Sequence, residues 1–201
     1  MGRIESIKSW LKTGSINLFG LPMSGKDTVG RRLSLDLGAE FLSSGDIIRK
    51  MEDEQNNHMT ENGQLIPTNV FYDWVLPYFS HVELKNKPLI LSSIGRWSGE
   101  EDEVMKSLSS AGHPTKIVLY LELTEAEVRR RWQKAKELGD RGERPDDMDP
   151  AVFETRIKEF HEKTLPVLKR YEELGLLRKI PAEGTREEVY NRVLAVLHSE
   201  C

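Results

Sequence analysis

The sequence predicts an α/β fold of three layers, in which a five-stranded parallel sheet is covered by helices on both faces. Short apolar runs alternate along the chain with longer amphipathic ones. Strands separated by helices of about ten or more residues are joined by crossover connections, which make neighbouring strands parallel. The length of 201 residues is enough for one such domain with a sizeable core.

The five strands are expected in short runs that are largely apolar, the first of which is typical of a buried strand. These runs cover residues 16–19, 40–42, 88–92, 116–121 and 176–180. The last of them is short and is expected near an edge of the sheet. Helices are expected over 26–37, 47–54, 69–81, 101–109, 125–137, 150–174 and 186–198. Pro77 is expected to kink or end the third of these helices, because proline lacks the amide that a helix interior uses.

Three segments stand apart from this alternation. Residues 1–14 form an N-terminal extension to a single domain that covers 15–201. The extension carries one apolar helical face, so both a docking helix and a partly ordered tail are open; the face consists of Ile4, Ile7, Trp10 and Leu11. Residues 55–65 are polar and Asn-rich, and residues 139–149 combine two arginines, two glycines, a proline and five acidic residues. Both polar segments are expected at the surface.

Composition excludes several classes of function. The chain is 38% hydrophobic and 31% charged with a net charge of −4, so nucleic acid and anionic membranes are not expected as partners. The single cysteine, Cys201, can form neither an internal disulfide nor a multi-cysteine zinc site. There is no secretory signal and no apolar run long enough to span a bilayer, so we expect a cytoplasmic location.

The strongest motif lies between the first strand and the first long helix. Residues 20–28 read GLPMSGKDT, which fits a phosphate-binding loop in its strand–loop–helix setting. Glycines let successive amides point at one anion, and the helix N-terminus adds partial positive charge. Lys26 is expected to reach the β- and γ-phosphates, and Thr28 to reach phosphate or magnesium. The candidate ATP-binding residues here are Gly20, Met23, Ser24, Gly25, Lys26, Asp27 and Thr28.

From this loop onward, residues 15–197 resemble the adenylate kinase family of nucleoside monophosphate kinases. Residues 43–49 read SSGDIIR and are similar to the family's S-T-G-D followed, after two further residues, by Arg. Residues 63–67 read GQLIP and resemble its G-x-L-V-P. The resemblance implies a P-loop NTPase fold with a monophosphate-binding helical insert at about 43–80 and a short lid at about 139–149. It also implies an acceptor site formed by Ser44, Arg49, Gln64, Leu65, Ile66, Ser93, Arg96, Glu100, Arg144 and Arg156.

The segment at the end of the third strand departs from the family. Where the family usually has D-G-F-P-R with a Gln four residues later, residues 92–96 read SSIGR and residue 100 is Glu. Arg96 is retained as the expected ligand of the acceptor phosphate. The usual Asp, which helps to hold hydrated magnesium, is Ser92, and the Gln that reads adenine is Glu100. A carboxylate accepts from an exocyclic amine but cannot donate to a ring nitrogen, so the acceptor base stays open.

The last matching segments surround the lid. Arg131 aligns with the family arginine at the start of the lid, Arg144 with an R-x-D-D motif at its end and Arg156 with an arginine on the next helix. Gly184 lies in a segment similar to the loop beside the ATP adenine, and the lid has no four-cysteine zinc knot. The resemblance implies that Lys26, Arg96, Arg131, Arg144 and Arg156 are catalytic, because phosphoryl transfer needs in-line positioning and charge neutralisation.

The implied activity is transfer of the γ-phosphoryl group of MgATP to a nucleoside monophosphate, with AMP as the first choice. The alternatives are a kinase for CMP, UMP or a deoxynucleotide, and a non-catalytic nucleotide-binding switch, which the loss of Asp at residue 92 favours slightly. Asp27 follows the loop lysine directly, where it can restore a carboxylate to the water shell of Mg²⁺ or simply stabilise a helix N-terminus. A monomer is expected from the resemblance.

Overall fold

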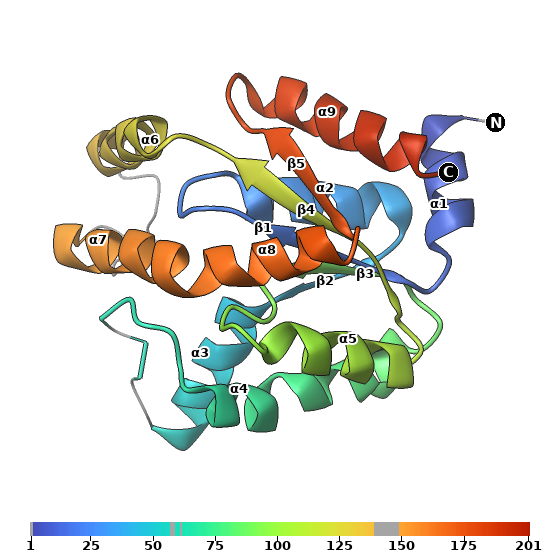
Figure 1. Ribbon diagram of the computed structural model, residues 1–201, viewed down its shortest axis with the longest axis horizontal. Coiled ribbons are helices and arrows are strands. Elements are labelled where there is room, and N and C mark those ends of the chain that lie inside the picture. Colours follow the sequence, from blue (N-terminus) through green and yellow to red (C-terminus); the bar gives the residue numbers. More distant parts are fainter. Residues whose placement is uncertain (1, 57–58, 61, 139–148) are drawn as a thin grey trace.

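The computed structural model of the chain describes residues 2–56, 59–60, 62–138 and 149–201. Five apolar runs form a sheet in the order β2-β3-β1-β4-β5, with every neighbouring pair parallel (Figure 1). The strands are β1 (Ser15–Phe19), β2 (Glu40–Ser43), β3 (Leu89–Ser92), β4 (Thr115–Glu122) and β5 (Leu177–Pro181). The predicted parallel sheet is confirmed, and β5 lies at an edge as expected.

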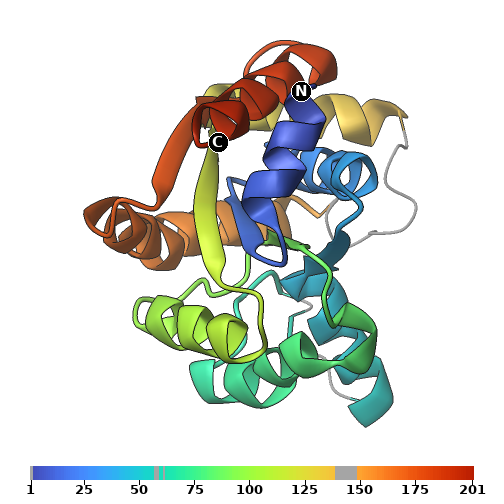
Figure 2. The ribbon, with the colours of Figure 1, turned by 90° about the vertical axis from the view of Figure 1, so that its right-hand side faces the viewer.

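Helices cover both faces of this sheet, which confirms the predicted three layers. Helices α1, α2 and α9 pack on one face, and α5 and α8 pack on the other (Figures 1 and 2). The α-helices are α1 (Arg3–Leu11), α2 (Lys26–Leu37), α3 (Ser44–Gln55), α4 (Thr68–Trp74), α5 (Glu100–Ser110), α6 (Glu125–Leu138), α7 (Pro150–Glu159), α8 (Leu165–Glu173) and α9 (Arg186–Ser199). Among the described helices, none is long and apolar enough to cross a membrane.

Prolines shape two of the helical stretches. The helix predicted over 69–81 is α-helical only as far as Trp74, and Pro77 then lies in a 3₁₀ segment, η1 (Leu76–Ser80), followed by η2 (Val82–Leu84). The helix predicted over 150–174 is continuous through α7, a π-helical segment η4 (Phe160–Thr164) and α8. Pro166 stands in the first turn of α8, and its missing amide removes a bond of the regular α-helical ladder just after the π segment.

Two hydrophobic cores lie under these helices. The larger one surrounds the central strands β1 and β4, and it includes the fully buried Ile7 and Leu11 of α1. The first helix therefore docks on α9 and α2. Of the two alternatives for the N-terminal extension, a docking helix or a partly ordered tail, the structure shows the docking helix. The smaller core joins β3 to α3, α4, η1 and α5, with Phe79 and Leu91 fully buried. This second core supports the part of the chain that was expected to bind the acceptor.

A buried asparagine extends the contact between β1 and β3 beyond the end of the sheet. Asn17 donates from Nδ2 to the Ile94 carbonyl at 2.8 Å, and its Oδ1 accepts from the Ile94 amide at 3.3 Å. The Ser93 amide also donates to the Leu18 carbonyl at 2.9 Å. The chain that follows β3 is thus held beside the strand that leads into the phosphate loop.

We predict opposite effects on stability for two buried tyrosines. The Tyr190 hydroxyl donates to Asp36 Oδ2 at 2.5 Å, whereas the buried Tyr171 hydroxyl has no hydrogen-bond partner within the described part of the chain. Tyr190→Phe should lower the free energy of unfolding by about 1.5–3 kcal/mol, because the bond to a carboxylate is lost. Tyr171→Phe should raise it by about 1 kcal/mol, because an unsatisfied buried polar atom is removed. Urea unfolding of the two variants and the parent measures both changes, and a loss of stability in Tyr171→Phe would contradict the second.

Candidate active site

The phosphate loop turns tightly between β1 and α2. Gly25 adopts φ of 88° and Met23 φ of 66°, and the left-handed conformation at a non-glycine residue indicates local backbone strain of the kind found at ligand-binding loops. A Cβ atom at Gly20 would overlap the side chain of Ser24, so the close return of the loop requires glycine. No described side chain caps α2, which begins at Lys26. The loop therefore ends at a helix N-terminus suited to an anion.

Asp27 and Ser92, the two departures around the expected magnesium site, are in direct contact. Ser92 ends β3, which is hydrogen-bonded to β1, and its Oγ donates to Asp27 Oδ1 at 2.5 Å. Asp27 thus brings a carboxylate to the place where the end of β3 meets the loop. Carboxylate and hydroxyl oxygens are the hard ligands that Mg²⁺ prefers, so the pair fits this ion. The side chain of Thr28, the other residue predicted for magnesium, is exposed.

Arg131 reaches the phosphate loop from α6. Its guanidinium donates to the Ala182 carbonyl at 2.7 Å and to the Met23 carbonyl at 3.5 Å, and Nε donates to Glu127 Oε1 at 3.0 Å. Bonds from Arg130 and then from Arg131 lower the pKa of Glu127 to about 2, so this carboxylate is charged at neutral pH and holds the guanidinium in place. Arg131 therefore connects α6, the loop and the segment after β5 that leads to Gly184.

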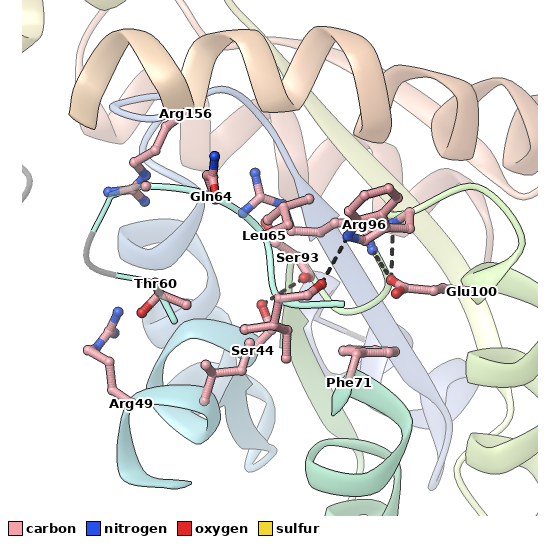
Figure 3. A pocket seen from close by; sticks show the side chains of 14 residues that line it. Ser44, Arg49, Thr60, Gln64, Leu65, Phe71, Ser93, Arg96, Glu100 and Arg156 are labelled. Carbon is pink, nitrogen blue, oxygen red and sulfur yellow. Dashed lines mark hydrogen bonds between the residues drawn. The ribbon is translucent and has the colours of Figure 1, made fainter. Parts of the chain in front are cut away.

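A pocket opens between α3, residues 63–66, the turn after β3, and α7 (Figure 3). Nine of the ten residues predicted to form the acceptor site line it, and Arg144 is the tenth. The lining includes Arg49, Arg96 and Arg156, whose guanidinium groups come from three separate parts of the chain. Ser93 belongs to the lining and follows Ser92 directly, so the pocket and the phosphate loop meet at the end of β3.

Arg96 is the most deeply placed of these cations. Burial lowers the pKa of its guanidinium to about 10, although the charges of Glu159, Glu100 and Asp27 oppose that shift. The side chain is still protonated at neutral pH. Arg96 is half-buried by solvent accessibility, and a cation whose neighbours only partly compensate for its lost hydration is a strong binding group for a ligand anion.

Arg49 and Arg156 lie farther from the sheet. Arg49 donates to Asp46 Oδ1 at 2.5 Å, and the other oxygen of Asp46 accepts from Arg31 at 3.2 Å. Arg156 packs close to Gly63, where a Cβ atom would come within 3.0 Å of Arg156 Cγ. Gly63 also has φ of 76°, so the close approach of α7 at this position depends on glycine.

Glu100 was expected at a position where family members recognise the base of the acceptor, but its carboxylate binds groups of the protein itself. It is 1% exposed, its Oε2 accepts from the amides of Arg96 at 2.8 Å and Trp97 at 3.0 Å, and its Oε1 accepts from Thr68 Oγ1 at 2.8 Å. Burial raises the pKa of Glu100, while these hydrogen bonds lower it. Ser44 is similarly engaged, since its hydroxyl donates to the Ser93 carbonyl at 2.8 Å. Both residues shape the pocket through bonds within the protein.

Sequence reasoning did not identify Trp97, which lines the pocket, or Glu159 and Lys163, which contact lining residues. The indole Nε1 of Trp97 donates to the Ile66 carbonyl at 3.1 Å, and Lys163 Nζ lies 4.0 Å from the centre of the indole ring. Glu159 accepts from Lys163 at 2.5 Å and from the Leu65 amide at 3.0 Å. The position of Trp97 directly after Arg96 was the one available signal, because the spacing of Glu159 and Lys163 is that of any i, i+4 ion pair on a helix.

Part of the expected lid lies outside the described residues. Arg144 belongs to residues 139–148, for which the structure gives no description, so its predicted roles stay predictions. Asp149, the last residue of the expected lid, caps α7 by accepting from the Ala151 amide at 2.7 Å. Gly184 adopts φ of 97° in the turn before α9, beside the capping box formed by Thr185 and Glu188.

Known proteins match most of the chain. The model of a family described as "AAA domain" matches residues 16–162. Adenylate kinase from Renibacterium salmoninarum is 32% identical over 188 residues, covering 90% of this chain and 94% of that protein. Adenylate kinase from Thermus thermophilus is 30% identical over 189 residues, with 91% and 96% covered.

A solved structure shares the fold at much lower sequence identity. The crystal structure of a gluconokinase from Sinorhizobium meliloti 1021 matches with a TM-score of 0.60 and 15% identity, over 93% of each chain. The predicted α/β P-loop NTPase fold is confirmed. Because relatives at 30% identity or above align along nearly the whole chain, this protein belongs to the adenylate kinase family.

Proposed function

We propose that the protein transfers the γ-phosphoryl group of MgATP to a nucleoside monophosphate, with AMP as the first acceptor to test. One observation carries the proposal: Arg49, Arg96 and Arg156 line a single pocket that meets the phosphate loop at the end of β3. A site that only bound a nucleotide would need fewer guanidinium groups on the far side of the loop. The names of the curated relatives support the same reaction.

The residues divide between donor and acceptor. Lys26 and the loop amides would bind the β- and γ-phosphates of ATP, with Arg131 beside them. Arg49 and Arg96 would grip the acceptor phosphate, because a planar guanidinium can bind two phosphate oxygens at once and stays charged. Arg156 would neutralise negative charge on the phosphoryl group during its transfer, together with Arg144, which lies outside the described residues.

Such an arrangement needs no side-chain base. Phosphoryl transfer depends on holding the attacking and leaving oxygens in line and on stabilising negative charge spread over the transferred group. The half-buried guanidinium of Arg96 has lost part of its hydration before the substrate arrives, so little reorganisation is needed when the phosphate binds. Its position after β3 is fixed by Glu100, which accepts from its amide.

Mg²⁺ is the metal that this chemistry calls for, and it would supply charge neutralisation at the donor phosphates. We propose that Asp27 and Ser92 hold its water shell jointly, with the carboxylate on the loop and the hydroxyl on β3. In the family pattern the carboxylate stands at residue 92. The contact of 2.5 Å between Asp27 and Ser92 supports this exchange of positions.

A coupled assay with MgATP and each of AMP, GMP, CMP and UMP tests the proposal. We expect ADP formation that depends on both substrates, with AMP among the acceptors. Calorimetric titration of ATP on the same preparation is the control for an intact phosphate loop. ATP binding without turnover of any monophosphate would contradict the proposal and favour a nucleotide-binding switch.

We expect Arg96→Met to lower kcat/KM for the acceptor by about 10²–10³-fold, because a half-buried charge that lines the acceptor pocket is removed. The same variant should unfold at a higher temperature than the parent. Burial holds the pKa of Arg96 at about 10, below its usual value, so the charged form costs the folded state free energy that methionine does not. Kinetics and thermal unfolding measure the two effects.

Arg129→Met is the matched control, since Arg129 pairs with Glu125 and Glu154 on the surface, away from the pocket. Its activity should equal that of the parent. Full activity in Arg96→Met would remove Arg96 from the acceptor site.

We expect Asp27→Gly to raise the Mg²⁺ concentration needed for half-maximal turnover by about 10–100-fold, as for other groups that hold a metal's outer shell. The double variant Asp27→Gly/Ser92→Asp should return it towards the parent value, because a carboxylate again stands beside the loop. Magnesium titrations at fixed ATP measure both. An unchanged magnesium requirement in Asp27→Gly would mean that the carboxylate only stabilises the N-terminus of α2, worth about 0.3–1 kcal/mol.

A further inference from the structure

The acceptor pocket has two chemically different parts. Arg49, Arg96 and Arg156 make one part cationic, and under the proposed function Arg49 and Arg96 bind the phosphate of the acceptor while Arg156 neutralises the transferred group. The organic part of the acceptor must then lie against the rest of the lining. The selectivity of the site depends on which hydrogen-bonding groups in that remaining wall can still be offered to a base.

The carboxylate of Glu100 is already engaged within the protein. Three hydrogen bonds reach its two oxygens, from the amides of Arg96 and Trp97 and from the hydroxyl of Thr68. With 1% of the residue exposed, a base could approach this carboxylate only if the turn after β3 were rebuilt. Glu100 therefore holds the turn and does not read the acceptor.

Two main-chain carbonyls of the pocket are engaged in the same way. The Ile66 carbonyl accepts from the indole of Trp97 at 3.1 Å, and the Ser93 carbonyl accepts from the hydroxyl of Ser44 at 2.8 Å. Carbonyls at such positions could otherwise accept from the exocyclic amine of adenine, cytosine or guanine. Here each carbonyl already accepts one donor from the protein, and Ile66 and Ser93 are only 4% and 7% exposed, so the second lone pair of either oxygen is poorly accessible to a base.

The groups that remain discriminate poorly between bases. The aliphatic and aromatic part of the wall consists of Ile48, Leu65, Phe71 and Trp97. Gln64 also lines the pocket and is exposed, and its amide can present either a donor or an acceptor edge by rotating. Trp97 is held rigidly by its bond to Ile66 and by the ammonium of Lys163 over its ring, so it offers a fixed aromatic surface that any base can contact.

We propose that the acceptor site takes purine and pyrimidine monophosphates alike, with Trp97 as the residue that binds the base without selecting it. This inference rests on the proposed function. Apolar contacts separate related substrates by about 10–200-fold, whereas a site that hydrogen-bonds a defining group separates them by about 10⁴–10⁵-fold. A pocket in which Glu100 and the Ile66 and Ser93 carbonyls have partners within the protein, and in which Gln64 can rotate its amide to suit any base, belongs to the first kind.

The test is a comparison of kcat/KM for AMP, GMP, CMP and UMP with saturating MgATP. We expect all four values to lie within about 200-fold of one another. A wider spread overturns the inference, because it requires a group that reads the base. Calorimetric titration of the four monophosphates without ATP gives the same ranking from dissociation constants. If nothing is turned over, the proposed reaction fails, and the spread of those constants still decides the inference by the same limit.

Variants of Trp97 and Glu100 test the stated roles. Trp97→Ala should weaken binding of all four monophosphates by about tenfold, since each loses the aromatic surface. Trp97→Phe keeps an aromatic ring but frees the Ile66 carbonyl, so AMP, CMP and GMP should gain relative to UMP. Glu100→Gln should change all four affinities by one common factor, and a changed ranking would show that Glu100 reads the base. Trp10→Phe, on α1, is the control and should leave every affinity unchanged.

Discussion

The distance between the two halves of the site is set by the pairing of β1 with β3. Strand β1 leads into the phosphate loop, and β3 leads into the turn that carries Arg96. Neither half of the site can therefore shift without disturbing hydrogen bonds at the centre of the sheet. Asn17 continues that pairing past the last residue of β3 by exchanging two hydrogen bonds with Ile94. The contact between Asp27 and Ser92 follows directly from this register.

Around this fixed centre, acidic residues position the cations. Glu127 holds Arg131, Asp46 holds Arg49, and Glu159 holds Lys163 beside Trp97. The chain as a whole is acidic, with a net charge of −4, so the site owes its positive character to local placement and not to overall composition. Each acidic partner gives its cation a defined direction before any phosphate is present, which reduces the ordering that binding requires.

Much of the fold followed from local patterns in the sequence. Continuous apolar runs and amphipathic helices predicted the strands, their parallel arrangement and the placement of the phosphate loop, because these depend on burial and periodicity along short segments. The arginines could be assigned to an acceptor site through family motifs, and Arg49, Arg96 and Arg156 do line one pocket. Pro77 was expected to end or kink its helix, and the α-helix stops before it.

The engagement of polar groups could not be predicted in this way. Whether Glu100 faces a base or the amides of its own turn depends on the backbone path between Arg96 and the start of α5. The bond from Trp97 to Ile66 joins segments 31 residues apart in the sequence. Such contacts depend on the conformation of the loops, and that conformation cannot be predicted from the side-chain types alone.

The reciprocal placement of Asp27 and Ser92 has a consequence for how this lineage can change. Replacing Ser92 alone by aspartate would set two carboxylates side by side in a part-buried place, where like charges repel strongly. Replacing Asp27 alone would leave no acidic group at that spot. A descendant could reach the family pattern, with the carboxylate at residue 92, only through a single variant that has either two carboxylates or none at this site. Substitutions at the two positions are therefore expected to occur together.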